Sequence, residues 1–211
     1  MERRELLKMI ALVTGSAFIG GEFLLSGCKS NDAKLGGVTF SENDIAFLDE
    51  VGETILPTTK SPGAKAAQIG KYMETMVNDC YDEADQKTFH EGIKKLDEAS
   101  EKMFKTSFMN ATPQQRHDLL VSLDKEAKEY QKTKSEFDTA ENEKEKAEIA
   151  KGNKDYKKEK KSSHYFTMMK QLTLHGYFTS KVGATQALRH VAVPTKYEGC
   201  VPYKKGDRAW A

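Results

Sequence analysis

The sequence predicts a mainly α-helical protein: a compact helical domain with a long charged insertion, helical or disordered, and an irregular C-terminal strap. Three observations support this fold class. Apolar residues recur at the three- and four-residue spacing of amphipathic helices, capping residues stand where those helices would begin, and no segment alternates apolar and polar residues as a half-buried strand does. The 211 residues suit one domain of ordinary size plus appendages.

The composition is balanced in charge and polar for a globular protein. Lys and Arg number 33 against 32 Asp and Glu, so the net charge is +1 and gives no overall attraction to nucleic acid. Hydrophobic residues make up 38% and charged residues 31%, which is polar for a globular chain. We therefore expect some segment to be solvated and to lack a core of its own.

The first two predicted helices flank a proline-rich loop. Residues 41–56 begin with Ser41 as a cap, followed three residues later by Asp44, and Pro57 ends the helix. Its apolar stripe is Ile45, Phe47, Leu48, Val51, Ile55 and Leu56. A second helix is expected to start near Pro62, a residue suited to the first helical position, and to run to about Cys80.

Two further helices precede the change in composition. Residues 84–108 carry an apolar side that comprises Phe89, Ile93, Leu96, Met103 and Phe104. Thr112, Pro113 and Gln115 form a capping box with proline in the first turn, which starts a fourth helix. An acidic cluster, residues 79–85, lacks the spacing of a calcium loop, and we interpret it as a helix N-terminal region.

From about residue 124 to 161, charged residues of both signs dominate and apolar residues keep no stripe. Such a segment cannot bury enough surface to fold alone, so it is either a solvated helix held by Glu–Lys pairs or a mobile loop. Apolar residues return in 162–188, where two helices joined by a short break are expected to pack into the core or against a partner. The remaining residues have no helical period and predict an irregular strap.

The N-terminus has the features of an export signal. Arg3 and Arg4 precede an interrupted apolar stretch, as in twin-arginine signals, and that stretch is too short for a comfortable membrane span. Residues 25–28, LSGC, resemble a bacterial lipobox, which predicts that Cys28 is lipidated and holds the protein at a membrane. An uncleaved anchor helix or a signal cut elsewhere are the alternatives. We therefore divide the chain into a signal (1–27), a tether (28–40) and one domain (41–211).

The sequence offers no recognisable catalytic constellation. It contains no CxxCH, no CxxC pair and no glycine-rich phosphate or dinucleotide loop. Its five histidines are scattered singly, and we interpret His164 and His175 as core or interface groups and Met168 and Met169 as packing residues. We therefore predict no catalytic, cofactor-binding or metal-binding residue in this chain.

Cys80 and Cys200 remain once Cys28 is assigned to the anchor. In an oxidising compartment an even pair favours a disulfide, which would close a loop of about 120 residues and contribute about 3–5 kcal/mol. The alternative is two separate free thiols.

Two segments carry a resemblance to a known family. Residues 52–77, with the element ILPTTKSPGA, and residues 164–203, with the element GYFTSKVGA, resemble the gluconate 2-dehydrogenase subunit 3 family. The likeness extends over most of the chain from about Phe40, apart from the charged insertion. It implies a small helical subunit beside a large flavin-dependent sugar or sugar-acid dehydrogenase, which holds FAD, often with a cytochrome c subunit that holds haem.

The resemblance and the export signal together give the leading hypothesis. The chain is expected to be a non-catalytic, periplasmic, lipid-anchored subunit of an oxidoreductase complex that assists folding, export or anchoring of the large subunit. The candidate contact residues are Tyr177, Phe178, Tyr197, Tyr203 and Trp210. An independent periplasmic ligand-binding lipoprotein is the alternative, and a catalytic oxidoreductase would need a cofactor site that the sequence does not provide.

Overall fold

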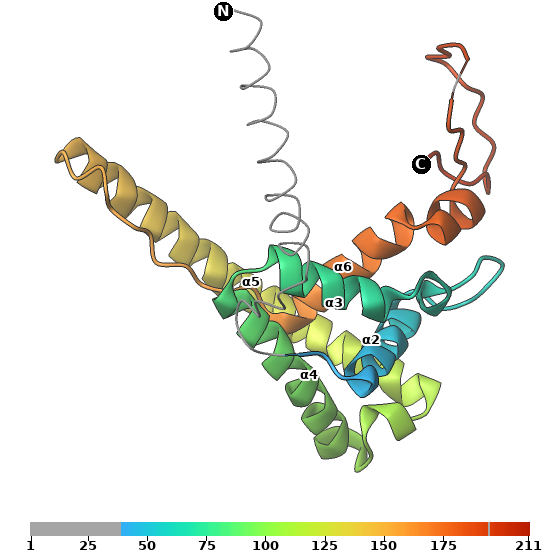
Figure 1. Ribbon diagram of the computed structural model, residues 1–211, viewed down its shortest axis with the longest axis horizontal. Helices are drawn as coiled ribbons and strands as arrows, with labels where there is room; N and C mark the ends of the chain where they lie inside the picture. Colours follow the sequence, from blue (N-terminus) through green and yellow to red (C-terminus); the bar gives the residue numbers. More distant parts are fainter. Residues whose placement is uncertain (1–38, 194) are drawn as a thin grey trace, which may run out of the picture. The chain divides into compact units, whose positions relative to one another are not determined.

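The computed structural model describes residues 39–193 and 195–211, so Arg3, Arg4 and Cys28 lie outside the described residues. In chain order the elements are α2 (Glu42–Ile55), η1 (Ala64–Ala67), α3 (Ile69–Cys80), α4 (Glu83–Phe104), η2 (Phe108–Asn110), α5 (Pro113–Ala150), α6 (Tyr165–Thr179) and η3 (Gly183–Ala187) (Figure 1). Within the described ranges no strand forms, apart from one isolated bridge between Arg189 and Trp210. The mainly α prediction is confirmed.

Side-chain caps fix where three of the helices begin. The side chains of Ser41, Asp82 and Thr112 each accept a hydrogen bond from the backbone N–H three residues later. At Ser41 and Thr112 the reciprocal bond is also present, which completes a capping box. The predicted cap at Ser41, the predicted box at Thr112 and the interpretation of the acidic cluster as a helix start are confirmed, since each signal is local.

Two predicted boundaries are wrong because contacts between helices set them. Ala64–Ala67 forms a 3₁₀ turn, Gln68 adopts a left-handed conformation with φ 53°, and α3 starts only at Ile69. There the Gly70 N–H donates to Asp49 of α2 over 2.8 Å. The predicted helix 84–108 ends at Phe104, since the chain turns at Lys105 so that Phe108 enters the core.

Helix α6 packs at the centre of the helical body. It contacts α2, α3, α4 and α5 (Figure 1). Met168 and Met169 are both buried in this core, which confirms their predicted packing role. The largest fully buried side chains include Phe89, Phe108, Leu48, Ile69, Met73, Leu96, Leu119 and Met169. The apolar stripes read from the sequence therefore meet around one helix.

Close contact with α6 requires glycine at two positions. A Cβ added at Gly92 of α4 would lie 2.4 Å from Cβ of Tyr165, and one added at Gly176 would lie 2.4 Å from the ring of Tyr72. Both distances are far below van der Waals contact. The absence of a side chain at these positions lets α3 and α4 approach α6 closely.

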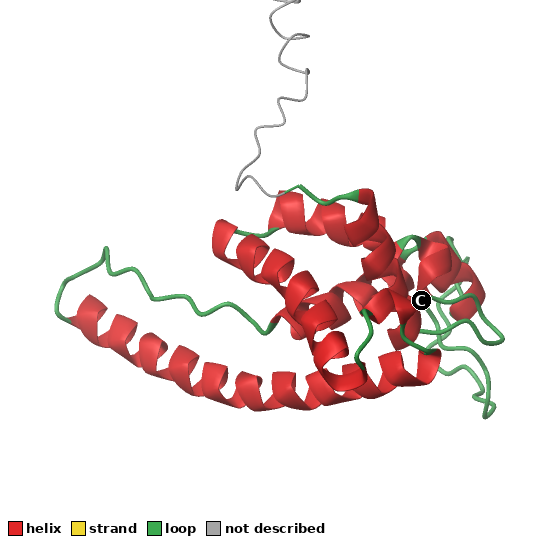
Figure 2. Cartoon of the chain, turned by 90° about the horizontal axis from the view of Figure 1, so that it is seen from below, coloured by secondary structure: helices red, strands yellow, loops and turns green. Residues whose placement is uncertain are grey.

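The charged insertion is a helical extension followed by a return segment. Helix α5 continues to Ala150, and residues 151–164 run back along it (Figure 2). We call residues 131–161 the arm. Lys–acid pairs one turn apart hold its helix, as the first of the two alternatives predicted: Lys132–Glu129, Lys134–Asp138, Lys144–Glu141 and Lys151–Glu148.

Specific contacts hold the return segment against α5 and α4. Glu141 is buried and accepts hydrogen bonds from the Tyr156 hydroxyl and the Glu159 N–H. Lys160 forms ion pairs with Asp82 and Asp85 at the start of α4. In the described part of the chain, no helix is long and apolar enough to cross a membrane.

Candidate partner-binding surface

The loop of residues 57–63, which follows α2, is organised by one carboxylate. Glu53 accepts hydrogen bonds from the Thr58 N–H, the Thr58 hydroxyl and the Lys65 N–H, over 2.7–3.0 Å. A Cβ added at Gly63 would lie 2.3 Å from the Glu53 carboxylate, so only glycine fits there without a shift. The element ILPTTKSPGA thus encodes a defined loop around Glu53.

The same loop meets the end of α6. The Tyr177 hydroxyl donates a hydrogen bond to the Pro62 carbonyl. Just beyond α6, the Ser180 hydroxyl donates to the Tyr177 carbonyl and accepts from the Gly183 N–H. A Cβ at Gly183 would collide with the Tyr177 carbonyl at 1.9 Å. The two segments that carry the family resemblance are therefore neighbours in space.

Tyr177 is not available to a partner, which corrects one predicted contact residue. Its side chain belongs to the core and is only 4% exposed, whereas its neighbour Phe178 is 39% exposed. Successive residues of a helix point in different directions, and Tyr177 shares the buried side of α6 with Thr173 and Met169. Helical spacing alone would have marked Tyr177 as a buried residue. We instead grouped it with the adjacent aromatic residue Phe178 as a contact residue.

The irregular C-terminal segment, residues 188–211, is held together at its base. The Arg189 N–H donates to the Ala209 carbonyl over 2.7 Å, and the Ala211 N–H donates to the Arg189 carbonyl over 3.0 Å. The Arg189 guanidinium lies over the Trp210 ring. Arg208 donates to the carbonyls of Thr185 and Gln186, which attaches the segment to η3. Figure 1 shows it as the red chain beyond η3.

This segment exposes most of the predicted contact residues. Tyr197 is 95%, Tyr203 78% and Trp210 53% exposed. Three valines that the sequence analysis did not single out are also exposed: Val191, Val193 and Val201. Because the segment has no periodic structure, the sequence contained no pattern that marks these valines as surface residues.

All of these exposed residues except Tyr203 line a hollow of about 640 Å³, which we call the C-terminal hollow. Its walls include Arg189, Val191, Val193, Val201 and Trp210. The Arg189 Nε is buried and has no hydrogen-bond partner within the described residues. A depression lined mainly by apolar side chains, with a few polar groups, is typical of a binding surface.

The predicted disulfide is not formed. Cys80 and Cys200 are both free thiols, and both are exposed. The contacts of Tyr72 with His175 and Gly176 place the first turn of α3 beside the last turns of α6. Cys80 lies eight residues further along α3, about 12 Å away at 1.5 Å per residue. The segment that carries Cys200 begins beyond the end of α6 and is attached to η3.

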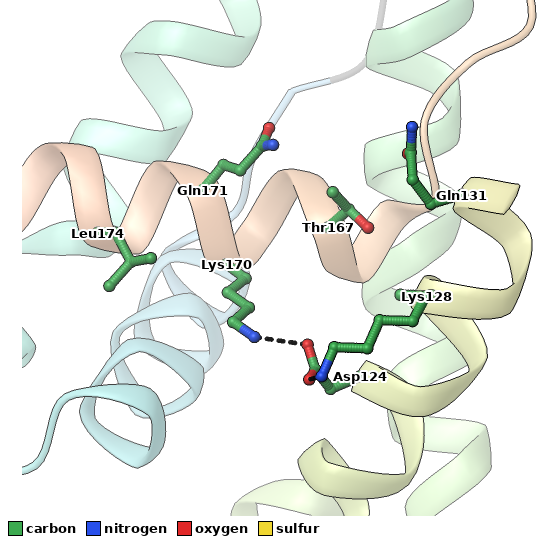
Figure 3. A pocket seen from close by; sticks show the side chains of 8 residues that line it. Asp124, Lys128, Gln131, Thr167, Lys170, Gln171 and Leu174 are labelled. Carbon is green, nitrogen blue, oxygen red and sulfur yellow. Dashed lines mark hydrogen bonds and ion pairs between the residues drawn. The ribbon is translucent and has the colours of Figure 1, made fainter. Parts of the chain in front are cut away.

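A second pocket, of about 260 Å³, lies between α5 and α6 (Figure 3). Asp124 of α5 lies 2.5 Å from Nζ of Lys170 and 2.7 Å from Nζ of Lys128. Hydrogen bonds from Lys128 and Lys170 hold the pKa of Asp124 below its ordinary value. The two lysines share one carboxylate, which joins the two helices through Lys170 and leaves one positive charge in excess at this pocket.

The two histidines of this region differ in burial: His164, which precedes α6, is buried, whereas His175 near the end of α6 is exposed and does not belong to the core. His164 is buried and its Nδ1 accepts from the Phe166 N–H over 3.3 Å, which caps α6. Burial lowers the pKa of His164. His175 Nδ1 lies 2.5 Å from the Tyr72 hydroxyl. In the residues that the structure describes, no group of three His, Cys, Asp or Glu side chains could hold a metal ion.

Comparison with known proteins identifies the family. The family model described as gluconate 2-dehydrogenase subunit 3 matches residues 42–195, a range that contains every helix described above. No curated protein and no solved structure shows significant similarity to the chain. The family match covers the loop of residues 57–63, α6 and the start of the C-terminal segment, and the chain belongs to the gluconate 2-dehydrogenase subunit 3 family.

Proposed function

We propose that the protein is a non-catalytic accessory subunit of a flavin-dependent dehydrogenase complex that oxidises a sugar or sugar acid. The family name describes one subunit of a gluconate dehydrogenase, which supports a role in a multi-subunit complex. In this proposal FAD belongs to a large catalytic subunit, and a cytochrome c subunit with haem is a third component. This chain assists the folding, export or membrane attachment of the large subunit.

One observation carries the proposal: apolar side chains of the C-terminal segment project into water. Val193 is 75% exposed, and Tyr197 and Tyr203 are exposed still further. Each square ångström of apolar surface removed from water stabilises a complex by about 25 cal/mol. Exposed apolar residues that cluster around a hollow are more typical of a protein–protein contact than of a surface that stays in water.

The N-terminal sequence supports a proposal for the location of the protein. We propose that Arg3 and Arg4 direct export by the twin-arginine route and that lipidated Cys28 holds the complex at the periplasmic face of a membrane. The twin-arginine route carries folded proteins, so a large subunit without its own signal can be exported together with this chain.

Deletion of the gene tests this role in the cell. We expect membrane-bound dehydrogenase activity toward gluconate, glucose or a glucoside to fall, and the wild-type gene to restore it. When the variant Cys28→Ser is supplied instead, we expect the restored activity to appear in the soluble periplasmic fraction and not in the membrane fraction. Unchanged activity toward all three substrates would favour the alternative, an independent ligand-binding lipoprotein.

A further inference from the structure

The C-terminal segment carries an excess of positive charge. Residues 188–211 contain five basic side chains, Arg189, Lys196, Lys204, Lys205 and Arg208, and two acidic ones, Glu198 and Asp207. Glu198 pairs with Lys196, and Asp207 lies 3.9 Å from Arg189. Within the described residues, Lys204 and Lys205 form no ion pair. Both are exposed, so their charges are available to a partner.

The apolar hollow and these free charges belong to the same loop. Val191, Val193 and Val201 line the C-terminal hollow, and Lys204 and Lys205 follow Val201 by three and four residues. The Arg189 side chain, which also lines the hollow, adds a further positive charge beside these valines. An occupant that satisfies all of these groups must combine an apolar side chain with carboxylates beside it.

We infer that the C-terminal hollow receives an apolar side chain from an acidic surface loop of the large subunit. Carboxylates beside that side chain meet Lys204 and Lys205, whose charges no acid of the described residues neutralises. This inference rests on the proposed function, because it assigns the contact surface of the same complex. It adds the chemistry that the large subunit must present.

The positive charge of the segment also argues against two other occupants of the C-terminal hollow. A second copy of the chain would bring the same positive segment to its counterpart, and like charges repel. The tether of residues 28–40 carries two lysines against one aspartate, so it does not supply the carboxylates. An acidic protein surface is the occupant that the charges favour.

The loop is organised before a partner arrives. Arg189 is bonded through its backbone to Ala209 and Ala211 and stacks on Trp210, while Arg208 binds carbonyls of η3. A surface already held in its binding shape loses less conformational entropy on association. This organisation suits a loop that binds through a few apolar side chains.

The test is a charge reversal with a matched control. An affinity tag inserted after Gly152, at the exposed tip of the arm, leaves both chain ends free. The variant K204E/K205E is compared with K154E/K157E, which reverses two exposed lysines of the arm that form no ion pair among the described residues. The measured quantity is the flavoprotein retained by the tagged chain as the salt concentration rises.

We expect the wild type and the arm variant to retain the flavoprotein, less at high salt, and K204E/K205E to bind it about tenfold more weakly. Val201→Asn should weaken binding without changing the salt dependence. Equal retention by K204E/K205E and the wild type would overturn this inference and leave the proposed function intact. A wild-type chain that retains no flavoprotein would overturn both.

A second measurement separates a protein partner from a lipid surface. The Cys28→Ser chain, which cannot be lipidated, is mixed with vesicles of phosphatidylglycerol and phosphatidylcholine. We expect this chain to sediment with the vesicles no more than the same chain with K204E/K205E does. Sedimentation that depends on Lys204 and Lys205 would show a lipid-binding surface and would overturn the inference of an acidic protein partner.

Discussion

The guanidinium carbon of Arg189 lies 4.4 Å from the centre of the Trp210 ring, and the two residues also form the isolated bridge of the structure's described part. This pair joins the two ends of the C-terminal segment. A cation over an aromatic face contributes about 0.5–1 kcal/mol at an exposed site. The contact therefore holds an otherwise irregular loop in one shape and positions the C-terminal hollow.

Removal of this contact should loosen the loop and leave the helices unchanged. Trp210 is the only tryptophan of the chain, so its fluorescence reports on the pair directly. We expect Arg189→Ala to shift the emission to the red and to increase quenching by acrylamide, while helical circular dichroism stays the same. Lys196→Ala is the control, and an identical effect of the two variants would contradict this role of Arg189.

Alanine should be tolerated at Gly52 and rejected at Gly92. A Cβ at Gly92 would lie 2.4 Å from the Cβ of Tyr165, an atom that cannot swing aside, whereas one at Gly52 meets its nearest neighbours at an ordinary 3.4 Å. We expect Gly92→Ala to cost about 1–3 kcal/mol of unfolding free energy. Gly52→Ala should be neutral or stabilising, since alanine favours a helix by about 0.5–1 kcal/mol over glycine. Urea unfolding measures both, and equal costs would contradict the close approach of α4 and α6.

Tyr177→Phe tests the contact between the two family segments. The substitution keeps the buried ring and removes the hydroxyl that donates to the Pro62 carbonyl. We expect a loss of about 1 kcal/mol and faster hydrogen exchange in residues 57–63. Tyr203→Phe changes an exposed hydroxyl and serves as the control. An unchanged exchange rate in that loop would show that the bond does not organise it.

Glu141 should hold the return segment of the arm. Its side chain is buried and lies 2.6 Å from Lys144, besides accepting from Tyr156 and Glu159. We expect Glu141→Gln to increase hydrogen exchange in residues 156–161 without lowering the stability of the helical body. Glu143→Gln, at an exposed position of the same helix, should have no effect. If residues 156–161 remain protected from hydrogen exchange in the Glu141→Gln variant, other contacts hold the return segment in place.

The same contact predicts a dependence on pH. The hydrogen bond from Lys144, followed by that from the Glu159 N–H, lowers the pKa of Glu141 below its ordinary value of 4.5. A lowered pKa in the folded state means that the contact stabilises fully above pH 4.5 and is lost as the pH falls through the folded pKa. The NMR shift of the Glu159 amide should therefore titrate with a midpoint below 4.5. A midpoint above 4.5 would contradict the predicted direction.

Local signals explain which parts of the fold could be predicted from the sequence. The caps at Ser41 and Thr112 depend on residues three apart, so the sequence contained the whole interaction. The start of α3 depends on Asp49 of another helix, and the end of α4 depends on the burial of Phe108. Such contacts between distant segments leave no local pattern.

The candidate site was predicted only in part for a related reason. Aromatic composition pointed to Tyr197 and Tyr203, which are exposed, but it could not separate them from buried Tyr177, which helical spacing would have done. An even number of cysteines contains no information on distance, so the expected Cys80–Cys200 pair was not a geometric inference. The hollow and its valines arise from the closure of the loop by Arg189, which no sequence period records.

Copurification tests the central claim most directly. The full-length chain, tagged at the tip of the arm, is solubilised from membranes and purified, and the eluate is examined by gel and by absorbance. We predict a second, larger band and a flavin spectrum, with haem bands if a cytochrome subunit is also present. A colourless eluate that contains only this chain, folded, would contradict the assignment as an accessory subunit.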